Sequence, residues 1–546
     1  MKNCSRNLII LESYCIATII ILYFFAQDLL ISSLTSMLLA SLIILVLRSV
    51  SAGIARCTLI LYCIFFAIQI VTAILTGGYI DENMLLNLDE YSSIPLPMLV
   101  LIFAVILIYV FGGLLIKVLP YKNKPCLIIS VVLAFFTFYY TPYDLPVISF
   151  LKSAYSTTSK YYKHKKIDKK KKEEQKSMYG KNYIVPPEQY TTADIPNLQN
   201  KNIILFFAEA LSSKKIDLFN DYSHLTPNLS AFIKKSLYFD NYYNHTFTTY
   251  RGLRGQLSSS YQYTGVVMAE EMTTSSLSRK FYSEIVSLPK ILHQLGYNTY
   301  FLSAHTNTSC HLNTMLKTLD FDYVFTPEDF GFKTDLSDQQ LFAQLTKLTT
   351  EKRLKEPYFI GIYNIGTHFG QDSPDVKYQH GKNKLLNNIH NFDDAFGRWF
   401  DTLNANNKIL DNMAIVLTAD HSAFADEQYC ETFKYHPSAW CDKIPLAVYT
   451  TTISPQHIDV KGKNSIDLAP TILHMMRINS SKNYFLGCSL FQSSCNLPFE
   501  YYTIGGNVFY KTTEHGASQQ IPDHILSKIN DFYNLSEKFL IKDLLN

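Results

Sequence analysis

NIILFFAEALSS, residues 202–213, is the stretch that decides the fold, and TPNLSAFIKKSLYFDNYYNHTFTTYRGLRGQL, residues 226–257, follows it closely. Ile203 to Phe207 is a short uninterrupted apolar run, which is typical of a strand buried on both faces of a parallel sheet. Glu209 comes just past the carboxyl end of that run. In open α/β sheets ligands bind at this edge, so the pattern predicts a functional acid there.

A second apolar run ends in the same way. AIVLTADHS, residues 414–422, carries Asp420 and His421 at its end, and Thr248 and Thr249 lie between the two stretches in a turn. Since the carboxyl ends of parallel strands share one sheet edge, two carboxylates, an imidazole and a hydroxyl could converge on one divalent cation. The alternative interpretation is that these are ordinary surface carboxylates at strand ends.

Five apolar runs within the first 150 residues are long enough, or nearly so, to cross a hydrocarbon core of about 30 Å. They are Leu8 to Phe25, Leu29 to Leu47, Cys57 to Leu75, Met98 to Val118 and Cys126 to Tyr140. A single run of this kind could be a buried core helix, but five in succession favour a transmembrane domain over residues 1–150.

The loop charges predict the orientation, because Lys and Arg in short loops stay in the cytoplasm. Basic residues precede the first span and fill two loops: Lys2, Arg6, Arg48, Arg56, Lys117, Lys122 and Lys124. The other loops are acidic. We therefore expect a multi-pass protein of the cytoplasmic membrane with everything after Tyr140 outside. Residues 151–200 form a linker with nine lysines between 160 and 176, either solvated or resting on anionic lipid headgroups.

The rest of the chain, residues 201–546, has the composition of a soluble domain. The net charge of +3 is too small to indicate nucleic-acid binding, and no nucleic-acid motif is visible. Cys430 with Cys441 and Cys488 with Cys495 are close in sequence without zinc-knuckle spacing, so we expect two disulfides in an oxidising compartment.

Short apolar segments alternate with helical patterns, which predicts an α/β/α sandwich with a mostly parallel sheet. The expected strands are 203–207, 237–243, 299–302, 358–363, 413–418 and 446–450, and the expected helices are 227–232, 288–295, 338–348, 385–403 and 467–476.

The combination of motifs resembles the alkaline phosphatase and sulfatase superfamily. The motifs are the acid after the first strand, TPNL at 226–229, the turn threonine, TADHS at 418–422, KIPLAV at 443–448 and SIDLAPTIL at 465–473. Five preceding spans make the chain similar to the group of lipoteichoic acid synthases, phosphoglycerol transferases and phosphoethanolamine transferases.

The resemblance implies a metal centre and a nucleophile. The ligands would be Glu209, Thr249, Asp420 and His421, a set that suits zinc or manganese. Coordination would activate the Thr249 hydroxyl to attack a phospholipid headgroup and form a phospho-threonine. Thr248 is the rival nucleophile. Thr249 is preferred because the residues after it would begin a helix whose N–H groups favour a phosphate.

Four further residues are candidate substrate contacts. His368, in Gly366-Thr367-His368, matches a phosphate-contacting histidine of the superfamily and could be a general acid. His436 follows Asp420 at the distance of a second substrate-side histidine. Arg251 and Arg254 could clamp a phosphate. The structural alternatives are imidazoles bonded to backbone and arginines that are surface charges.

The sequence also departs from the motifs of both the phosphoethanolamine transferases and the lipoteichoic acid synthases. Phosphoethanolamine transferases carry GETAR at the first strand, where this chain has AEALS at 208–212. The FWNRD of lipoteichoic acid synthases aligns with residues 309–313, which loses the Trp at Cys310 and the Arg at Leu312. The donor headgroup therefore stays open.

The sequence predicts an enzyme that transfers phosphoethanolamine or phosphoglycerol from a membrane phospholipid to an envelope glycan or lipid. A phosphodiesterase or sulfatase-like hydrolase is the first alternative; a sulfatase would need Cys or Ser in C/S-x-P-x-R, which the turn at Thr249 lacks. An inactive, metal-free envelope scaffold is the second. A scaffold would be expected to have lost one of the four ligands, and none is lost.

Overall fold

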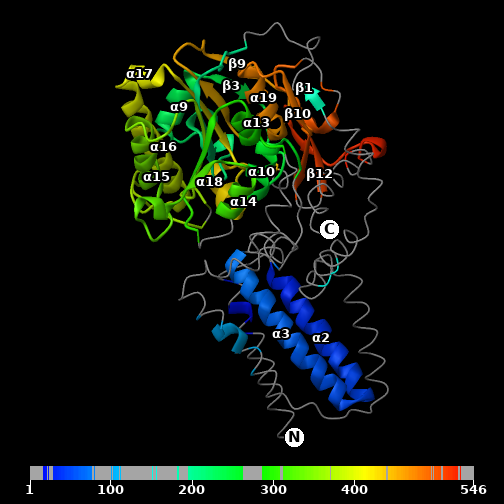
Figure 1. The fold of residues 1–546 in the computed structure, drawn as a ribbon. Coiled ribbons are helices and arrows are strands. Elements are labelled where there is room, and N and C mark those ends of the chain that lie inside the picture. The colour runs from blue at the N-terminus through cyan, green and yellow to red at the C-terminus, as the bar shows by residue number, and fades with distance from the viewer. Residues whose placement is uncertain are drawn as a thin grey trace. The chain divides into compact units, whose positions relative to one another are not determined.

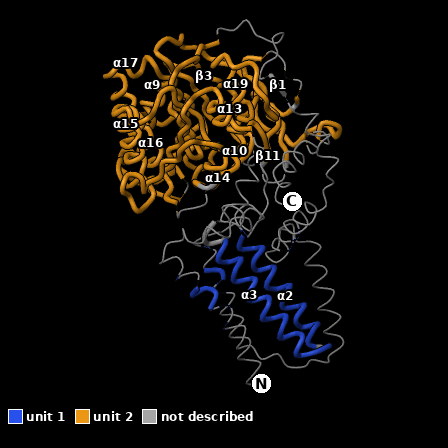
Figure 2. The backbone as a smooth tube through the Cα atoms, viewed as in Figure 1, with its two compact units in different colours: residues 1–163, 264–267 blue, residues 164–263, 268–546 orange. Residues whose placement is uncertain are grey.

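The computed structural model describes the C-terminal part of the chain over 195–261, 286–307, 312–368, 370–437, 441–492 and 497–526, apart from 506–507. In the N-terminal part it describes 29–76, and scattered positions such as 103–107, 181–183 and 495 complete the set. Two compact units are present: residues 1–163 with 264–267, and residues 164–263 with 268–546 (Figure 2).

The N-terminal unit contains two long apolar helices, α2 (Leu30–Val50) and α3 (Ala52–Thr76). Within the described residues, Leu30–Arg48 and Ala52–Thr72 are long and apolar enough to cross a membrane. They pack through Met37, Phe66 and Ile70. These helices correspond to the second and third expected spans. The first and fourth spans lie largely, and the fifth entirely, outside the described residues, so five crossings stay a prediction.

The C-terminal unit is organised around an eight-stranded sheet with the strand order β5-β4-β6-β2-β7-β8-β3-β9. Its strands are β2 (Asn202–Ala208), β3 (Leu237–Asp240), β4 (Asn298–Ser303), β5 (Tyr323–Phe325), β6 (Tyr358–Tyr363), β7 (Met413–Ala419), β8 (Leu446–Tyr449) and β9 (Gln456–Asp459). Only β8 runs antiparallel to its neighbours. The mostly parallel sheet and all six strands expected from the sequence are confirmed.

The central strand β2 lies between β6 and β7, and every residue of β2 and β7 is buried. An all-apolar strand can lie only where both sheet faces are covered. The register pairs Phe207 with Tyr363 on one side and Ala208 with Ala419 on the other. The residues that follow these strands therefore leave the sheet side by side.

Two groups of helices cover the sheet (Figure 1). Helices α9 (Pro227–Lys234), α15 (Asp338–Thr350) and α16 (Lys384–Asn404) pack together, and α10 (Thr249–Ser258) packs with α13 (Leu288–Gln294), α14 (Leu312–Thr318) and α19 (Leu468–Met475). The remaining helical segments are η4 (Ser213–Lys215), η5 (Asp217–Phe219), η6 (Pro327–Phe330), α17 (Asn407–Leu410), α18 (Glu427–Phe433), η7 (Ser465–Asp467) and η8 (Pro498–Tyr501). All five expected helices are present, and the last of them is divided between η7 and α19.

Two small sheets were not predicted from the sequence. The pair β1 (Lys181–Tyr183) and β10 (Ser480–Asn483) is antiparallel, and so is the three-stranded sheet of β11 (Tyr502–Gly505), β12 (Val508–Thr513) and β13 (Gly516–Ser518). Their strands are short and carry polar residues, so no long apolar run marks them.

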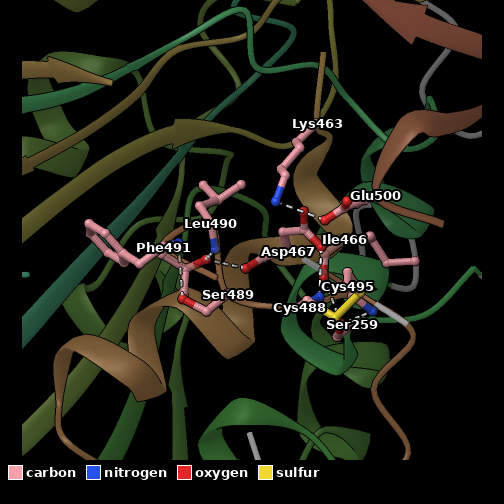
Figure 3. The surroundings of a disulfide bond; sticks show 12 residues. Ser259, Lys463, Ile466, Asp467, Cys488, Ser489, Leu490, Phe491, Cys495 and Glu500 are labelled. Atoms are coloured by element: carbon pink, nitrogen blue, oxygen red, sulfur yellow. Dashed lines mark hydrogen bonds and ion pairs between the residues drawn. A yellow bond between two sulfur atoms is a disulfide. The ribbon is translucent and has the colours of Figure 1, made fainter. Parts of the chain in front are cut away.

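The structure confirms one expected disulfide and contradicts the other. Cys488 and Cys495 are bonded (Figure 3), whereas Cys430 and Cys441 are free thiols. Cys430 lies in the apolar cluster around α18, but the Cys441 thiol bonds to Thr503. The two thiols are not bonded to each other, so their closeness in sequence did not predict a disulfide.

Candidate metal centre

The ends of β2 and β7 bring three buried ligand-type side chains together. Glu209, Asp420 and His421 each offer an atom within 4.8 Å of the others. His421 Nε2 lies 3.3 Å from Asp420 Oδ2 and 3.6 Å from Glu209 Oε1. All three side chains have at most 1 % exposure, so water does not solvate this cluster of acceptors.

The hydrogen bonds indicate which atoms carry lone pairs. The main-chain carbonyl of Ser422 lies 2.7 Å from His421 Nδ1, and a carbonyl can only accept, so Nδ1 is the protonated nitrogen. Burial lowers the pKa of His421, which leaves Nε2 with a free lone pair. Glu209 Oε1 and Asp420 Oδ2 have no hydrogen-bond partner. Buried acceptors without donors are costly, and a divalent cation would satisfy all three.

The two carboxylates of the cluster are buried together, and their pKa values shift in opposite directions. Burial and the neighbouring Glu209 charge raise the pKa of Asp420 well above its ordinary value. For Glu209, burial would also raise the pKa, but His421, His368 and hydrogen bonds from neighbouring side chains lower it. A protein that holds two carboxylates this close stabilises both negative charges only with nearby positive charge.

The Thr249 hydroxyl lies against the same cluster. Thr249 begins α10, and its Oγ1 donates to Glu209 Oε2 at 3.0 Å. The Tyr363 hydroxyl donates to the same oxygen at 2.6 Å. Thr248 precedes the helix with φ 73°, a conformation that is costly for a β-branched residue. The strained turn therefore positions Thr249 at the helix N-terminus, beside the carboxylate.

Close packing fixes α10 to the end of β7. A Cβ on Gly252 would lie 2.1 Å from the main-chain oxygen of Asp420, so only glycine permits this approach. Gln256 Nε2 donates to the carbonyls of Ala419 and Asp420, both at 2.9 Å. The contacts between α10 and the end of β7 thus fix the position of the Thr249 hydroxyl relative to the Asp420 carboxylate.

A buried polar network supports Glu209 from the β6 side. Asn364 accepts a hydrogen bond from the Glu209 main-chain N–H at 2.9 Å, and the Thr367 hydroxyl donates to the Glu209 carbonyl at 2.7 Å. Asp338 accepts from the Asn364 side chain at 3.0 Å. His368 follows directly and is half-buried, and it contributes to lowering the pKa of both Glu209 and His421.

The other expected substrate contacts have different surroundings. Arg254 has no exposed surface, and Arg251 is 8 % exposed and lies over the Phe247 ring. His436 is exposed beyond α18. In the part of the chain that the structure describes, no hydrogen bond or ion pair joins His436 to the buried cluster.

Sequence reasoning missed several residues of this region, namely Lys215, Gln256, Asp338, Tyr363, Asn364 and Thr367. Tyr363 and Asn364 stand at the end of an expected strand, and the strand-end argument used for Glu209 would have found them. Leu312, which takes the place of the family's Arg, packs in the hydrophobic core with 4 % exposure. Cys310 lies outside the described residues.

An α/β sheet of this topology, with acids, a histidine and a threonine at the start of a helix at its carboxyl edge, is typical of the alkaline phosphatase-like fold. A family model described as Sulfatase matches residues 201–478, and the chain belongs to that family. The expected resemblance to the sulfatase-family group that includes the lipoteichoic acid synthases is confirmed.

Curated relatives include lipoteichoic acid synthases 2 and 1 of Bacillus subtilis, each 23 % identical to this chain. The alignments cover 58 % and 68 % of this chain, and 52 % and 64 % of those proteins. The chain thus spans about half to two thirds of the length of these relatives.

Solved structures show the same fold. The lipoteichoic acid synthase LtaP from Listeria monocytogenes is 15 % identical with a TM-score of 0.51, and a Vibrio parahaemolyticus protein of the alkaline phosphatase superfamily is 18 % identical with a TM-score of 0.51. Each alignment covers 69 % of this chain, and 98 % and 96 % of those chains.

Proposed function

We propose that this chain is a membrane-anchored transferase that moves phosphoethanolamine or phosphoglycerol from a phospholipid to an envelope glycan or lipid. We call Glu209, Asp420 and His421 the metal-type cluster. The observation that carries the proposal is the Thr249 hydroxyl, which lies at a helix N-terminus 3.0 Å from the Glu209 carboxylate of this cluster. The lipoteichoic acid synthases among its relatives support transfer over hydrolysis. Helices α2 and α3 would anchor the domain to the membrane that supplies the donor.

The cluster fits a single divalent ion. Glu209, Asp420 and His421 would hold it, because their ligand atoms converge and Glu209 Oε1 and Asp420 Oδ2 lack donors. The Thr249 hydroxyl, which lies 3.0 Å from Glu209 Oε2, would be the fourth ligand. Two carboxylates with one imidazole suit zinc or manganese. When bound, the ion would lower the pKa of the Thr249 hydroxyl and stabilise negative charge on the phosphoryl oxygens.

The residues then carry out two displacements. The Thr249 hydroxyl gives its proton to Glu209 Oε2, the oxygen to which it is hydrogen-bonded. Thr249 Oγ1 then attacks the phosphorus of the lipid headgroup, and the bond from phosphorus to the diacylglycerol oxygen breaks. His368 supplies the proton that the leaving diacylglycerol oxygen takes up. In the second displacement an acceptor hydroxyl attacks the phospho-threonine and loses its proton to His368. The bond from phosphorus to Thr249 Oγ1 breaks, and Thr249 takes back its proton from Glu209.

The first turn of α10 would bind the transferred phosphoryl group. Its N–H groups lie at the helix N-terminus, where anions are favoured. Arg251 and His436 remain proposed substrate contacts, because each retains some exposure. The full burial of Arg254 favours support of the helix rather than direct contact with the lipid.

The donor headgroup is proposed from what the site lacks. A Leu at position 312 can donate no hydrogen bond to a glycerol hydroxyl. A site without such a donor separates similar headgroups by only about 10 to 200-fold. We therefore expect phosphatidylethanolamine to be accepted at least as well as phosphatidylglycerol.

The experiment is to incubate the purified full-length chain with Mn²⁺ or Zn²⁺ and each lipid in turn. The mass of the proteolytic peptide that contains Thr249 is then measured by mass spectrometry. A phosphoethanolamine adduct with released diacylglycerol supports the proposal in full. A glycerophosphate adduct alone would keep the transferase and overturn the donor preference. Free headgroup phosphate without any adduct would indicate a phosphodiesterase instead.

A further inference from the structure

A lysine is buried beside the metal-type cluster, although none of the proposed steps uses it. Lys215 ends the short segment η4, six positions after Glu209 in the sequence, and is 2 % exposed. Its Nζ donates to the main-chain carbonyl of Ala210 at 2.8 Å. Burying an ammonium group is costly unless nearby negative charge compensates, so its surroundings need to be acidic.

The surroundings of Lys215 are indeed acidic. Its charge interacts with four carboxylates, in decreasing order Glu209, Asp426, Asp420 and Asp442. Burial lowers the pKa of Lys215 to about 8, and these four groups oppose the shift. The contacts agree with this. Ala210, which accepts the hydrogen bond from Lys215, directly follows Glu209 in the sequence, and its main-chain N–H donates to Asp420 Oδ1 at 2.9 Å.

The second pair of acids, Asp426 and Asp442, is already satisfied by hydrogen bonds. Asp426 accepts from the main-chain N–H of Tyr429 at 2.7 Å, where it caps α18. Asp442 accepts from the hydroxyls of Tyr435 and Tyr429, at 2.8 and 3.2 Å. Glu209 and Asp420, in contrast, each retain an oxygen without a hydrogen-bond partner. Glu209 and Asp420 consequently need the positive charge of Lys215 more than Asp426 and Asp442 do.

A purely structural explanation accounts for only part of this arrangement. The hydrogen bond to Ala210 needs a donor, and a neutral side chain could provide one without the cost of a buried charge. Two carboxylates that face a common point repel one another when both are ionised. A fixed positive charge within the same buried region relieves that repulsion, as a second cation would.

We propose that Lys215 is a positioning residue that acts through Glu209 and Asp420, supplying the positive charge that would otherwise come from a second metal ion and so limiting the centre to one. This inference rests on the metal centre of the proposed function. The proposed role of Lys215 and a purely structural role predict different changes in metal affinity when the lysine is replaced. A nearby positive charge opposes cation binding, so removal of that charge strengthens binding.

The test is titration of Mn²⁺ into the metal-depleted full-length chain, with free Mn²⁺ measured by electron paramagnetic resonance. The wild type should bind one ion per chain. Lys215→Met should bind the first ion more tightly by about tenfold or more, as expected for loss of a nearby charge at low dielectric, and should take up a second. Lys215→Arg, which keeps the charge, should bind one ion as the wild type does.

The neighbouring Lys214 provides a matched control, because it lies in the same segment η4 and is only half-buried. Lys214→Met should leave both the affinity and the number of ions unchanged. If Lys215→Met does not fold, Lys215→Gln retains a donor for the Ala210 carbonyl and removes the charge, and the same tighter binding is expected.

Two results would count against the inference, and they are distinguishable. Unchanged or weaker Mn²⁺ binding in the charge-removing variants, with one ion in the wild type, would reduce Lys215 to a structural hydrogen bond. A wild-type chain that binds neither Mn²⁺ nor Zn²⁺ would overturn the metal centre itself, and the role of Lys215 with it.

Discussion

At the scale of single residues, the centre is defined by acceptors that lack donors. Glu209 Oε1 and Asp420 Oδ2 are buried without hydrogen bonds, and the lone pair on His421 Nε2 faces both. The Thr249 hydroxyl is oriented by its hydrogen bond to Glu209. We propose that all four side chains hold a cation and that one of them, Thr249, also reacts.

The first residue-scale prediction concerns the nucleophile. Thr249→Ala should reduce adduct formation and turnover to below about 0.1 % of the wild type, since loss of a nucleophile costs several orders of magnitude. The fold should survive, because the variant loses one hydroxyl, worth about 1 kcal/mol. Thr248→Ala is the matched control and should keep most activity. Full activity of Thr249→Ala, with loss in Thr248→Ala, would move the nucleophile by one residue.

The second residue-scale prediction concerns the metal ligands. Asp420→Asn should weaken Mn²⁺ or Zn²⁺ binding by at least about 100-fold, because even residues that only support a ligand contribute 10 to 100-fold, and chelation should inactivate the wild type. Asp426→Asn, which can still cap α18, should keep its metal. The metal content of each variant, measured by elemental mass spectrometry, tests this prediction. An undiminished content in Asp420→Asn would remove that residue from the ligand set.

At the scale of elements, strand register and helix docking place the reactive groups. The pairing of Ala208 with Ala419 aligns the ends of β2 and β7. On the other side of the fold, Asp393 of α16 accepts hydrogen bonds from the main-chain N–H groups of Asn228 and Leu229 at 3.2 and 2.7 Å. It thereby caps α9 from another helix.

This inter-helix cap predicts a pH-dependent stability. Burial raises the pKa of Asp393 to about 7, above the value of about 3.9 in an unfolded chain. The folded protein therefore holds a proton more tightly, and the stabilisation is present below pH 4 and lost as pH rises towards 7. The free energy of unfolding should fall by at most about 1.4 kcal/mol per pH unit over that window.

Thermal unfolding of the full-length chain in detergent, followed between pH 4 and 7, measures this effect. In Asp393→Asn the corresponding slope should be absent. Asp401→Asn is the matched control, because Asp401 is an exposed residue of the same helix, and it should keep the wild-type slope. Equal slopes in all three proteins would mean that Asp393 is ionised throughout.

At the scale of the whole molecule, the chain combines an apolar helical unit with a sulfatase-family unit that contains a disulfide. The bond between Cys488 and Cys495 closes a loop near α19, where the Cys488 N–H donates to Asp467 at 2.8 Å (Figure 3). Disulfides persist in oxidising compartments. The bond thus agrees with the outside location expected from the loop charges.

Thiol labelling tests this location. In protein denatured without reduction, the peptides with Cys488 and Cys495 should resist a maleimide, and they should react after reduction. Cys430 and Cys441 should react once the chain is unfolded, since both are buried free thiols. Free thiols at both 488 and 495 in freshly prepared protein would place the domain on the reducing side of the membrane.

The sequence by itself determined the α/β fold class of the C-terminal unit, the positions of the main strands along the chain, and Glu209, Thr249, Asp420 and His421 as the candidate residues of the site. It could do so because fully buried parallel strands are apolar throughout and end abruptly at their functional edge. Likewise, α2 and α3 were predictable because a helix in a bilayer needs a long uncharged run. These features are local, and local patterns can be recognised along the chain.

Only the tertiary structure decided which distant groups meet. Tyr363, Asn364 and Lys215 approach Glu209 because of strand order and burial, which no local pattern records. The short polar strands of the two small sheets follow from pairing partners, and Cys430 and Cys441 are not bonded to each other although they are close in sequence. Contacts between residues far apart in sequence depend on how the elements dock, because each element specifies its own conformation but not its neighbours.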